Sequence, residues 1–520
     1  MKKLCLTNLL IITAIFGAHA QKIDYLIKNG YVFDGTGADS VQQDIGIYQN
    51  KIVFIGNSNK LAQPPKKIID AKGKYIAPGF IDPHTHIERL LDSDDKEKRA
   101  ALIWLRQGVT TVLTGNDGYG KTNVGQIFSN WEKNGIGPNV AMFVGFGPVR
   151  TAVVGDMPVQ PTEKQVLEMQ QVVEQGMKDG AIGFSTGLSY LPQTFAKTPE
   201  IIALAKAASK YNGIYDTHMR AQSWPNSKGA IEEVLEIEKQ AGIKVHISHI
   251  KSSGPIAFGK STNILKLLDA ARKQGSTIDA SVYPYTASAN GLRGLLPLWA
   301  REEGTEKMVK NFDDPVSLEK IKAAVAQSLI KNGGGKTQLI TTRSKSMANL
   351  NGKTVAEIAN MWDVPEEEVI IRILKRNPTI GVISFGMDEG DVLNFLRKPY
   401  IVVGSDGTDS HPRGAGTFAK VINEYVIQQK IMPLKEMIYK STGLTAEKFK
   451  LKDRGVIKEG AIADIVIFDP KTYKANSTYQ NPTDLATGVQ AVFVNGQLVI
   501  ENDVYNGSLV GKVIRYNKQE

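Results

Sequence analysis

The sequence is almost free of cysteine, since Cys5 is the only one among 520 residues. It precedes the apolar part of the first twenty residues, and loss of that segment would leave a chain without disulfides or thiol nucleophiles. Beyond this segment, no apolar run approaches the ~18 to 20 residues that a membrane helix needs. These absences predict a fold that is stabilised by its core and exclude cysteine catalysis.

A concentrated block of basic residues is missing as well. The chain has 63 Lys and Arg against 53 Asp and Glu, a formal charge of +10, but the excess is spread along the sequence. Nucleic-acid binding is therefore not expected. There is no low-complexity segment, solenoid repeat or heptad pattern. The length suits one large α/β barrel with an accessory domain, or two to three ordinary domains.

The first residues have the pattern of an export signal. Two lysines precede an apolar core over residues 9–16, and a small-x-small cleavage site ends at Ala20. This pattern predicts a signal peptide over residues 1–20 and a soluble mature protein that is periplasmic or secreted, without membrane insertion. A lipid anchor is not expected, because Cys5 lies ahead of the apolar core instead of at the cleavage point.

Short strands separated by turns occupy both ends of the mature chain. Residues 22–75 and 463–500 have runs of β-branched and aromatic residues punctuated by Gly, Asp and Asn. We expect residues 21–75 and 455–520 to form one small β-sandwich domain, which would bring the two termini together.

The middle of the chain alternates strand and helix patterns, which favours parallel strands joined by helical crossovers. Eight such units predict a (β/α)8 barrel over residues 76–454, with the chemistry at the carboxyl ends of its strands. Helical, charged sequence over residues 290–375 interrupts the alternation and is expected to form an inserted cap. The expected strands are 75–81, 110–114, 140–145, 181–185, 213–217, 244–248, 277–283 and 400–404.

Four imidazoles and two carboxylates follow five of these strands. The set is His84, His86, Asp117, His218, His249 and Asp406. His84 and His86 lie one residue apart, so their side chains point to the same face. At one barrel mouth this set suits one or two Zn²⁺ ions, which would lower the pKa of bound water to near ~7 and make hydroxide available.

Longer motifs carry a resemblance to a known family. PGFIDPHTH and DRGVIKEGAIADIVIFDP resemble the amidohydrolase superfamily at large, whereas STGLSY, ISHIK, YPYTAS and HPRGAGTF resemble its D-aminoacylase or N-acyl-D-amino-acid deacylase group. The resemblance covers nearly the whole mature chain. It implies a metal-dependent hydrolase barrel with a small β-domain and a cap. It also implies zinc-dependent hydrolysis of N-acyl-D-amino acids at the amide bond, releasing a carboxylate and a free D-amino acid.

The resemblance implies metal-binding roles. His218 and His249 would hold one Zn²⁺ tightly, and His84 and His86 would serve a second, weaker position. Asp117 stands where the better known D-aminoacylases have a cysteine. A carboxylate can also bridge or ligate zinc, but this harder oxygen ligand leaves metal number and identity open.

Catalytic and substrate-binding roles are implied in the same way. Asp406 would be the general base, which takes a proton from water and passes it to the departing amine. Lys251, Tyr283 and Arg413 would bind the substrate α-carboxylate through a point charge, a phenol donor and a bidentate guanidinium. The preferred side chain, the acyl group and the oligomeric state stay open.

Another amidohydrolase reaction is the alternative, on a cyclic amide of the dihydroorotase or hydantoinase type or on a dipeptide. It would not need a free α-carboxylate. The carboxylated lysine of the cyclic amidases has no evident counterpart at the ends of the third and fourth strands, where Phe146 and Ser185 lie. A non-catalytic binding protein is disfavoured, because the expected histidines and Asp406 are all present.

Two further histidines are placed outside this set. His246 precedes His249 by three residues and should face the other side of the strand, which favours a structural role. His411 lies within the HPR motif and is open between substrate contact and support of its neighbours.

Overall fold

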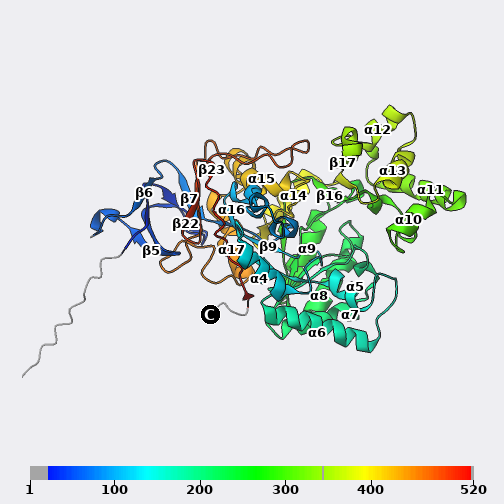
Figure 1. The fold of residues 1–520 in the computed structure, drawn as a ribbon, viewed down its shortest axis with the longest axis horizontal. Helices are drawn as coiled ribbons and strands as arrows, with labels where there is room; N and C mark the ends of the chain where they lie inside the picture. Colours follow the sequence, from blue (N-terminus) through cyan, green and yellow to red (C-terminus); the bar gives the residue numbers. More distant parts are fainter. Residues whose placement is uncertain (1–21, 62, 342–344, 517–520) are drawn as a thin grey trace, which may run out of the picture.

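The computed structural model describes residues 22–61, 63–341 and 345–516. The expected signal peptide, residues 1–20, lies outside them. Figure 1 shows β-sheets at one end of the long axis, a barrel in the middle and a cap at the other end. Among the described helices, none has the length and apolar character to cross a membrane.

Strands from both ends of the chain form two sheets beside the barrel. The first has the order β5 (Lys51–Gly56), β4 (Asp44–Tyr48), β1 (Tyr25–Lys28) and β6 (Lys67–Asp70). The second has the order β23 (Val504–Tyr505), β22 (Gln497–Glu501), β21 (Val489–Val494), β20 (Ile465–Phe468), β7 (Tyr75–Pro78), β2 (Tyr31–Val32) and β3 (Val41–Gln42). Buried residues of both sheets, such as Ile45 and Ile467, share one hydrophobic cluster.

The segment 75–81, expected as one barrel strand, is two strands in different sheets. β7 pairs with β20, whereas β8 (Phe80–Asp82) pairs with β9 (Val109–Thr114) of the barrel. Gly79 separates them, and a Cβ there would lie 2.1 Å from Oγ1 of Thr110. The chain therefore passes from the β-domain into the barrel at a position that has no room for a side chain.

Eight strand positions form the barrel, and all their pairings are parallel. One sheet contains β8, β9 and β10 (Asn139–Met142). The other contains β11 (Val144–Gly145), β12 (Gly183–Gly187), β13 (Ile214–His218), β14 (Lys244–Ile247), β15 (Asp279–Val282) and β19 (Ile401–Val403). Only Phe143 separates β10 from β11, and a parallel bridge between Thr85 and Gly407 joins the ends of β8 and β19.

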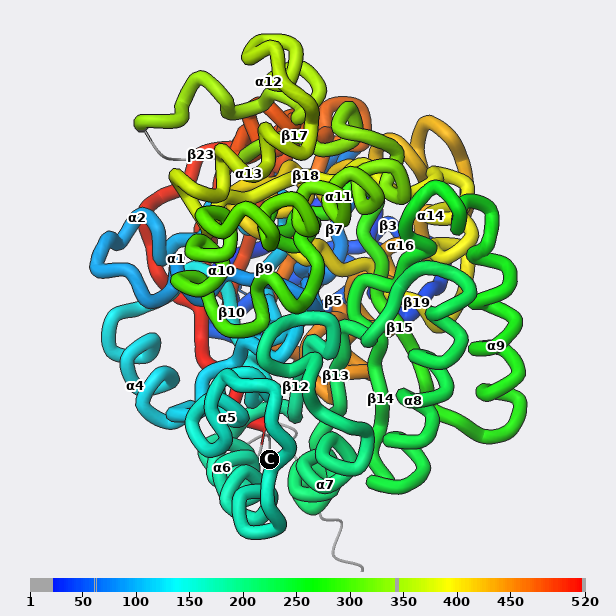
Figure 2. Tube along the Cα trace, turned by 90° about the vertical axis from the view of Figure 1, so that its right-hand side faces the viewer, coloured from blue at the N-terminus to red at the C-terminus, as the bar shows by residue number. Residues whose placement is uncertain are grey.

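Helices cover the outside of the barrel, as Figure 2 shows for the strands β12 to β15. They are α4 (Val124–Asn134), α5 (Phe146–Val153), α6 (Glu163–Asp179), α7 (Thr198–Ser209), α8 (Asn226–Ala241), α9 (Ser261–Lys273), α14 (Glu389–Leu396), α15 (Arg413–Lys420), α16 (Leu434–Ser441) and α17 (Gly443–Lys448). The α6 sequence illustrates the cause: Met169, Val173 and Met177 recur at helical spacing and are buried against the barrel.

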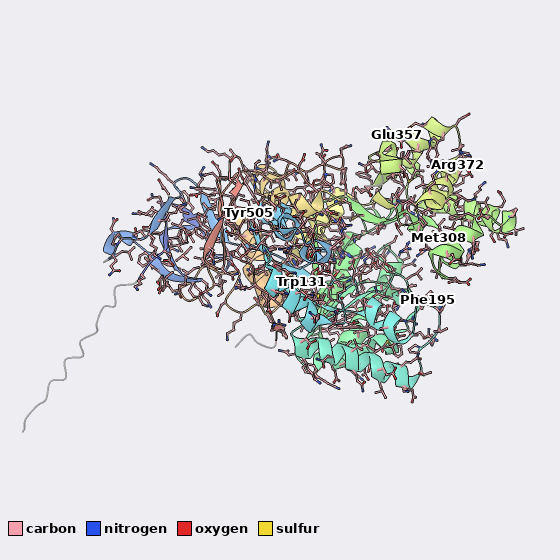
Figure 3. All side chains as sticks on the ribbon, viewed as in Figure 1. Trp131, Phe195, Met308, Glu357, Arg372 and Tyr505 are labelled. Carbon is pink, nitrogen blue, oxygen red and sulfur yellow. The ribbon has the colours of Figure 1, made fainter. Side chains whose placement is uncertain are left out.

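The cap is wider than the expected 290–375 and contains a sheet. Its first strand, β16 (Ala287–Gly291), leaves the barrel, and its last, β18 (Gly381–Phe385), returns to it. β18 lies in the middle of the sheet, between β16 and β17 (Gln338–Thr341). The helices are α10 (Thr305–Asn311), α11 (Pro315–Lys331), α12 (Val355–Trp362) and α13 (Glu366–Arg376). Their buried side chains form a hydrophobic core separate from that of the barrel. Figure 3 marks this part with Met308, Glu357 and Arg372.

The last described residues leave the β-domain for the barrel. Val513 forms a parallel bridge with Val140 of β10, and Ile514 belongs to the cluster that fills the barrel beside Ile81 and Leu113. The C-terminal segment thus completes the barrel interior as well as the β-domain expected over residues 455–520.

Candidate active site

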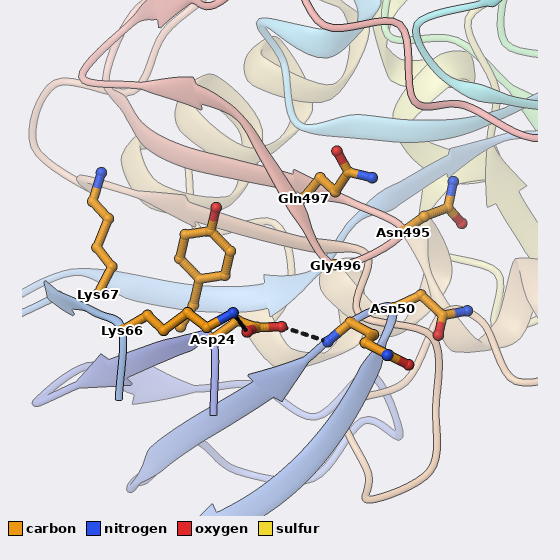
Figure 4. Close-up of a pocket in the computed structure, with 9 residues that line it drawn as sticks. Asp24, Asn50, Lys66, Lys67, Asn495, Gly496 and Gln497 are labelled. Atoms are coloured by element: carbon orange, nitrogen blue, oxygen red, sulfur yellow. Dashed lines mark hydrogen bonds and ion pairs between the residues drawn. The ribbon is translucent and has the colours of Figure 1, made fainter. Parts of the chain in front are cut away.

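A cavity of about 610 Å³ lies between the barrel mouth and the cap, lined by residues of both. Barrel residues include His86, Asp117 and His249, and cap residues include Asn290 and Arg293. A second hollow lies in the β-domain, where Lys66 forms an ion pair with Asp24 at 2.7 Å (Figure 4). Its lining contains none of the predicted site residues, so the chemistry expected from the sequence belongs to the barrel cavity.

The five predicted metal ligands and the predicted base, Asp406, gather at one point of the barrel cavity. Ligand atoms of His84, Asp117, His249 and Asp406 all lie within 4.8 Å of one another. The Nε2 atom of His86 lies 3.1 Å from Oδ1 of Asp406. The Nδ1 atom of His218 lies 3.1 Å from Nε2 of His249 and 3.6 Å from Oδ2 of Asp117. Asp117 therefore faces all four histidines.

Three of these residues have left-handed backbone conformations. The φ angles are 57° at Asp117, 34° at His249 and 50° at Asp406. Such conformations are uncommon for residues with a side chain and persist where the surrounding structure imposes them. Each lies just beyond a barrel strand, so the chain turns sharply there at the edge of the cavity.

The donor set fits a divalent metal ion. His84 is 1% exposed, and neither of its ring nitrogens has a hydrogen-bond partner among the described residues. Its Nε2 atom faces carboxylate oxygens of Asp117 at 3.6 Å and Asp406 at 3.5 Å, which is too long for a hydrogen bond. Imidazole and carboxylate groups are ligands of zinc and related metals, and here such groups point toward one another from distances that leave His84 without a hydrogen bond.

The electrostatics of the cluster also suit a cation. Burial lowers the pKa of His249 to about 4 and that of His84 well below its usual range, so both rings are neutral and able to bind a metal. Burial also acts to lower the pKa of His86, but Asp117 and Asp406 outweigh it and raise that pKa to about 10. The two carboxylates thus create a site for positive charge.

Of the predicted carboxylate-binding residues, Lys251 and Arg413 line the cavity beside this cluster, whereas Tyr283 lies outside the lining, with its hydroxyl toward Sδ of Met387. The Arg413 guanidinium carbon is 4.7 Å from the Tyr283 ring centre, and Lys251 Nζ is 5.3 Å from the same point. Arg413 forms an ion pair with Asp406 at 2.8 Å, and Lys251 donates to Nδ1 of His249 at 2.9 Å. The buried Nε of Arg413 has no partner among the described residues. Burial lowers the pKa of Lys251 to about 8.

Several contacts were not predicted from the sequence. The hydroxyl of Tyr190 lies 2.9 Å from Nδ1 of His218, and Oγ of Ser189 lies 2.9 Å from its Nε2. Both residues belong to the STGLSY motif, so the family resemblance could have indicated that they lie at the site. Arg293 and Arg301 of the cap line the cavity, and no sequence pattern placed them there.

The two remaining histidines lie outside the cavity lining. His246 is buried, with Nδ1 2.5 Å from a carboxylate oxygen of Asp279. His411 is also buried, with Nε2 3.2 Å from the Ala287 carbonyl, while its Nδ1 accepts from the Arg413 backbone N–H at 3.1 Å. His411 thus connects the first cap strand to the start of α15, where Arg413 lies.

A (β/α)8 barrel with histidines and carboxylates at its strand ends defines a metal-dependent hydrolase. The sequence matches the amidohydrolase family over residues 75–499. The chain belongs to this family, and within it to the D-aminoacylase group.

Individual relatives match over almost their whole length. D-aminoacylase from Alcaligenes xylosoxydans xylosoxydans is 31% identical over 95% of this chain and 98% of its own. N-acyl-D-glutamate deacylase from the same organism is 30% identical over 92% of this chain and 93% of its own. A crystal structure of N-acyl-D-glutamate deacylase from Bordetella bronchiseptica, complexed with zinc and a phosphonate inhibitor, has a TM-score of 0.81 at 30% identity, over 95% of this chain and 100% of that one.

Proposed function

We propose that this protein hydrolyses the amide bond of N-acyl-D-amino acids and releases a carboxylate and a free D-amino acid. The observation that carries the proposal is a single cavity in which a metal-binding cluster adjoins the buried cations Lys251 and Arg413. A metal can polarise an amide carbonyl, and the cations can bind the substrate carboxylate. Relatives named for this activity, at about 30% identity over nearly the whole chain, support it.

Zn²⁺ is the proposed metal. His218, His249 and Asp117 would hold one ion tightly, and His84 and His86 would serve a second, weaker position. When bound, zinc supplies a Lewis acid and water with a lowered pKa. The complex of the Bordetella bronchiseptica relative with zinc supports this choice.

Asp406 is the proposed general base. Burial opposes its ionisation, but the charge of Arg413 and the hydrogen bond with His86 help to outweigh burial, and the pKa of its carboxyl lies well below its usual range. An ionised carboxylate can accept the proton of the attacking water and deliver it to the leaving amine nitrogen.

Stereoselectivity follows from two fixed points on the substrate. Lys251, Tyr283 and Arg413 hold the α-carboxylate, and the metal cluster fixes the position of the acyl carbonyl. With both ends fixed, the side chain of only one enantiomer extends into the open part of the cavity, toward the cap.

An acidic side chain fits the cap side of the cavity. Arg293 and Arg301 line it, and within the described part of the chain they donate hydrogen bonds to neutral oxygens, Thr305 Oγ1 and the Leu296 carbonyl. Burial and the nearby Arg293 lower the pKa of Arg301, against an opposing contribution from Glu302, so two cations lie close to each other. A second substrate carboxylate would relieve their repulsion. The relative that deacylates N-acyl-D-glutamate supports this preference.

Binding of the substrate α-carboxylate by Lys251, Tyr283 and Arg413, here called the carboxylate clamp, distinguishes this function from hydrolysis of a cyclic amide or another neutral amide. The parent enzyme should hydrolyse an N-acetyl-D-amino acid roughly ten- to over a hundred-fold more efficiently than its α-carboxamide, since one charged hydrogen bond contributes about 1.5–3 kcal/mol. Arg413→Lys should lose a similar factor on the acid and little more on the amide, because an ammonium lacks the planar fork. Equal rates on acid and amide in the parent enzyme would rule out the clamp.

We also propose export with removal of residues 1–20, which the lysines and apolar core of that segment support. The mature protein isolated from its producing cells should begin at Gln21, as mass spectrometry of the intact chain can determine. An isolated protein that still contains residues 1–20 would contradict this proposal.

A further inference from the structure

Two fully buried carboxylates, Asp82 and Asp216, lie directly before candidate ligands in the barrel. Both are 0% exposed. Asp82 ends β8 two residues before His84, and Asp216 lies in β13 two residues before His218. Residues two apart in an extended strand share a face, so each carboxylate lies on the same side of its strand as an imidazole.

Asp216 connects residues that adjoin ligands on other strands. Its two carboxylate oxygens accept from Oγ of Ser248 at 2.7 and 2.8 Å, and Oδ2 accepts from Nδ2 of Asn116 at 3.0 Å. Ser248 immediately precedes His249, and Asn116 immediately precedes Asp117. The Asp216 carboxylate therefore holds the residues that precede two ligands, Asp117 and His249, in addition to lying on the same strand as His218.

Asp82 repeats this construction on the other side of the site. Its Oδ1 accepts from the Ser405 backbone N–H at 2.8 Å, and its Oδ2 accepts from Oγ of the same serine at 2.5 Å. Oδ2 also accepts from Nε1 of Trp104 at 3.0 Å. Ser405 immediately precedes Asp406. In both cases a buried aspartate accepts from the hydroxyl of a serine that immediately precedes a residue of the site: the candidate ligand His249 after Ser248, and the proposed base Asp406 after Ser405.

The two halves are also connected to each other. The Nδ2 group of Asn116 donates to the Pro83 carbonyl at 3.1 Å as well as to Asp216. The residues held in this way precede Asp117, His249 and Asp406, the three with left-handed backbone. A backbone in that sparsely populated region needs its neighbours fixed, and these hydrogen bonds fix the residue just before each turn.

We propose that Asp82 and Asp216 are positioning residues that set the geometry of the metal site through Ser405, Ser248 and Asn116. This inference rests on the metal site of the proposed function and adds residues that do not touch the substrate. Asp216 controls the position formed by Asp117, His218 and His249, and Asp82 controls the side formed by His84 and Asp406. Removing a group that supports a metal ligand without binding the metal itself commonly lowers metal affinity by roughly 10- to 100-fold.

A purely structural role is the competing explanation, and Asp279 provides the matched control. It is 1% exposed in β15, and its oxygens contact His246 at 2.5 Å and Lys448 at 2.9 Å. Neither partner adjoins a candidate ligand. Asp279→Asn should therefore lower thermal stability and leave metal affinity unchanged.

The experiment compares the parent enzyme with Asp216→Asn, Ser248→Ala and Asp279→Asn. Zn²⁺ affinity is measured by competition with a chromophoric chelator, and the ligand field is measured by visible absorption of the Co²⁺-substituted proteins. Thermal melts establish that each variant is folded. Asp216→Asn and Ser248→Ala should weaken the tight metal position by roughly 10- to 100-fold and change the cobalt spectrum. Ser248→Ala removes one hydroxyl only and serves as the test if Asp216→Asn does not fold.

Parental affinity and an unchanged cobalt spectrum in a folded Asp216→Asn or Ser248→Ala protein would overturn the inference. So would an equal loss of affinity in folded Asp279→Asn. The variants Asp82→Asn and Ser405→Ala should instead weaken metal binding at the position that includes His84. These readouts need no substrate, so a parent protein that binds zinc but hydrolyses no N-acyl-D-amino acid would contradict the proposed function alone.

Discussion

In the proposed mechanism, Asp406 contacts both functional parts of the cavity. It lies 3.1 Å from Nε2 of His86 on the metal side and 2.8 Å from Nη1 of Arg413 on the carboxylate-binding side. A proton acceptor between these two parts would be within reach of a water that attacks the acyl carbonyl of a substrate bound by both parts. Its ionisation is maintained by Arg413, so a substrate carboxylate bound at Arg413 changes the charge around the base.

Asp406→Asn should preserve the fold and the tightly bound metal but remove proton transfer. We expect kcat on an N-acyl-D-amino acid to fall by roughly 10²-fold or more. Asp409→Asn is the matched control, because Asp409 lies in the same loop and pairs with Arg89 at the surface. Turnover and metal content measured together decide the role. Near-normal turnover in Asp406→Asn would remove this residue from the mechanism.

The structure brings together the residues whose position follows from strand geometry. His84 and His86 were grouped by alternation, and the other ligands by their places after strands. The contact between Arg413 and Asp406 was not predictable, because it depends on the path of the loop between β19 and α15. The contacts of Tyr190 and Ser189 with His218 were also missed, since strand periodicity does not describe the turn after β12.

At the scale of elements, the cap shows where local patterns are insufficient. Its helices follow from their apolar spacing, as in α13, where Val369, Ile370 and Ile373 are buried. Its first strand, Ala287–Gly291, has the sequence ASANG, which lacks β-branched and aromatic residues. This strand exists because it pairs with β18, about ninety residues later, and such tertiary pairing is absent from the local sequence.

The cap arginines give a prediction at the same scale. Arg293→Met should reduce efficiency on N-acetyl-D-glutamate by up to about fivefold, since Arg293 is exposed, and Arg301→Met by roughly tenfold. Efficiency on N-acetyl-D-leucine should not fall. Arg372→Met is the control, because Arg372 lies on α13 of the cap and outside the cavity lining (Figure 3). Equal losses on both substrates would contradict an anion-binding role.

For the whole molecule, composition and alternation predicted the architecture better than its boundaries. Eight strand patterns predicted the barrel, because each βα unit is recognisable from local periodicity. The division of 75–81 at Gly79 and the return of Val513 to β10 depend on contacts between distant parts of the chain. Such contacts leave no periodic signal. Family likeness over nearly the whole chain is therefore a stronger guide to the fold than any single segment.

The central claim is metal-dependent hydrolysis of an N-acyl-D-amino acid. The most direct test measures hydrolysis of N-acetyl-D-glutamate and N-acetyl-L-glutamate by the purified protein before chelation, after chelation and after Zn²⁺ is restored. We predict that the D enantiomer reacts roughly 10²-fold faster, since a misplaced scissile carbonyl loses about that factor, and that activity disappears with the metal and returns with zinc. Full activity in metal-free protein, or preference for the L enantiomer or for a cyclic amide such as a hydantoin, would contradict the account.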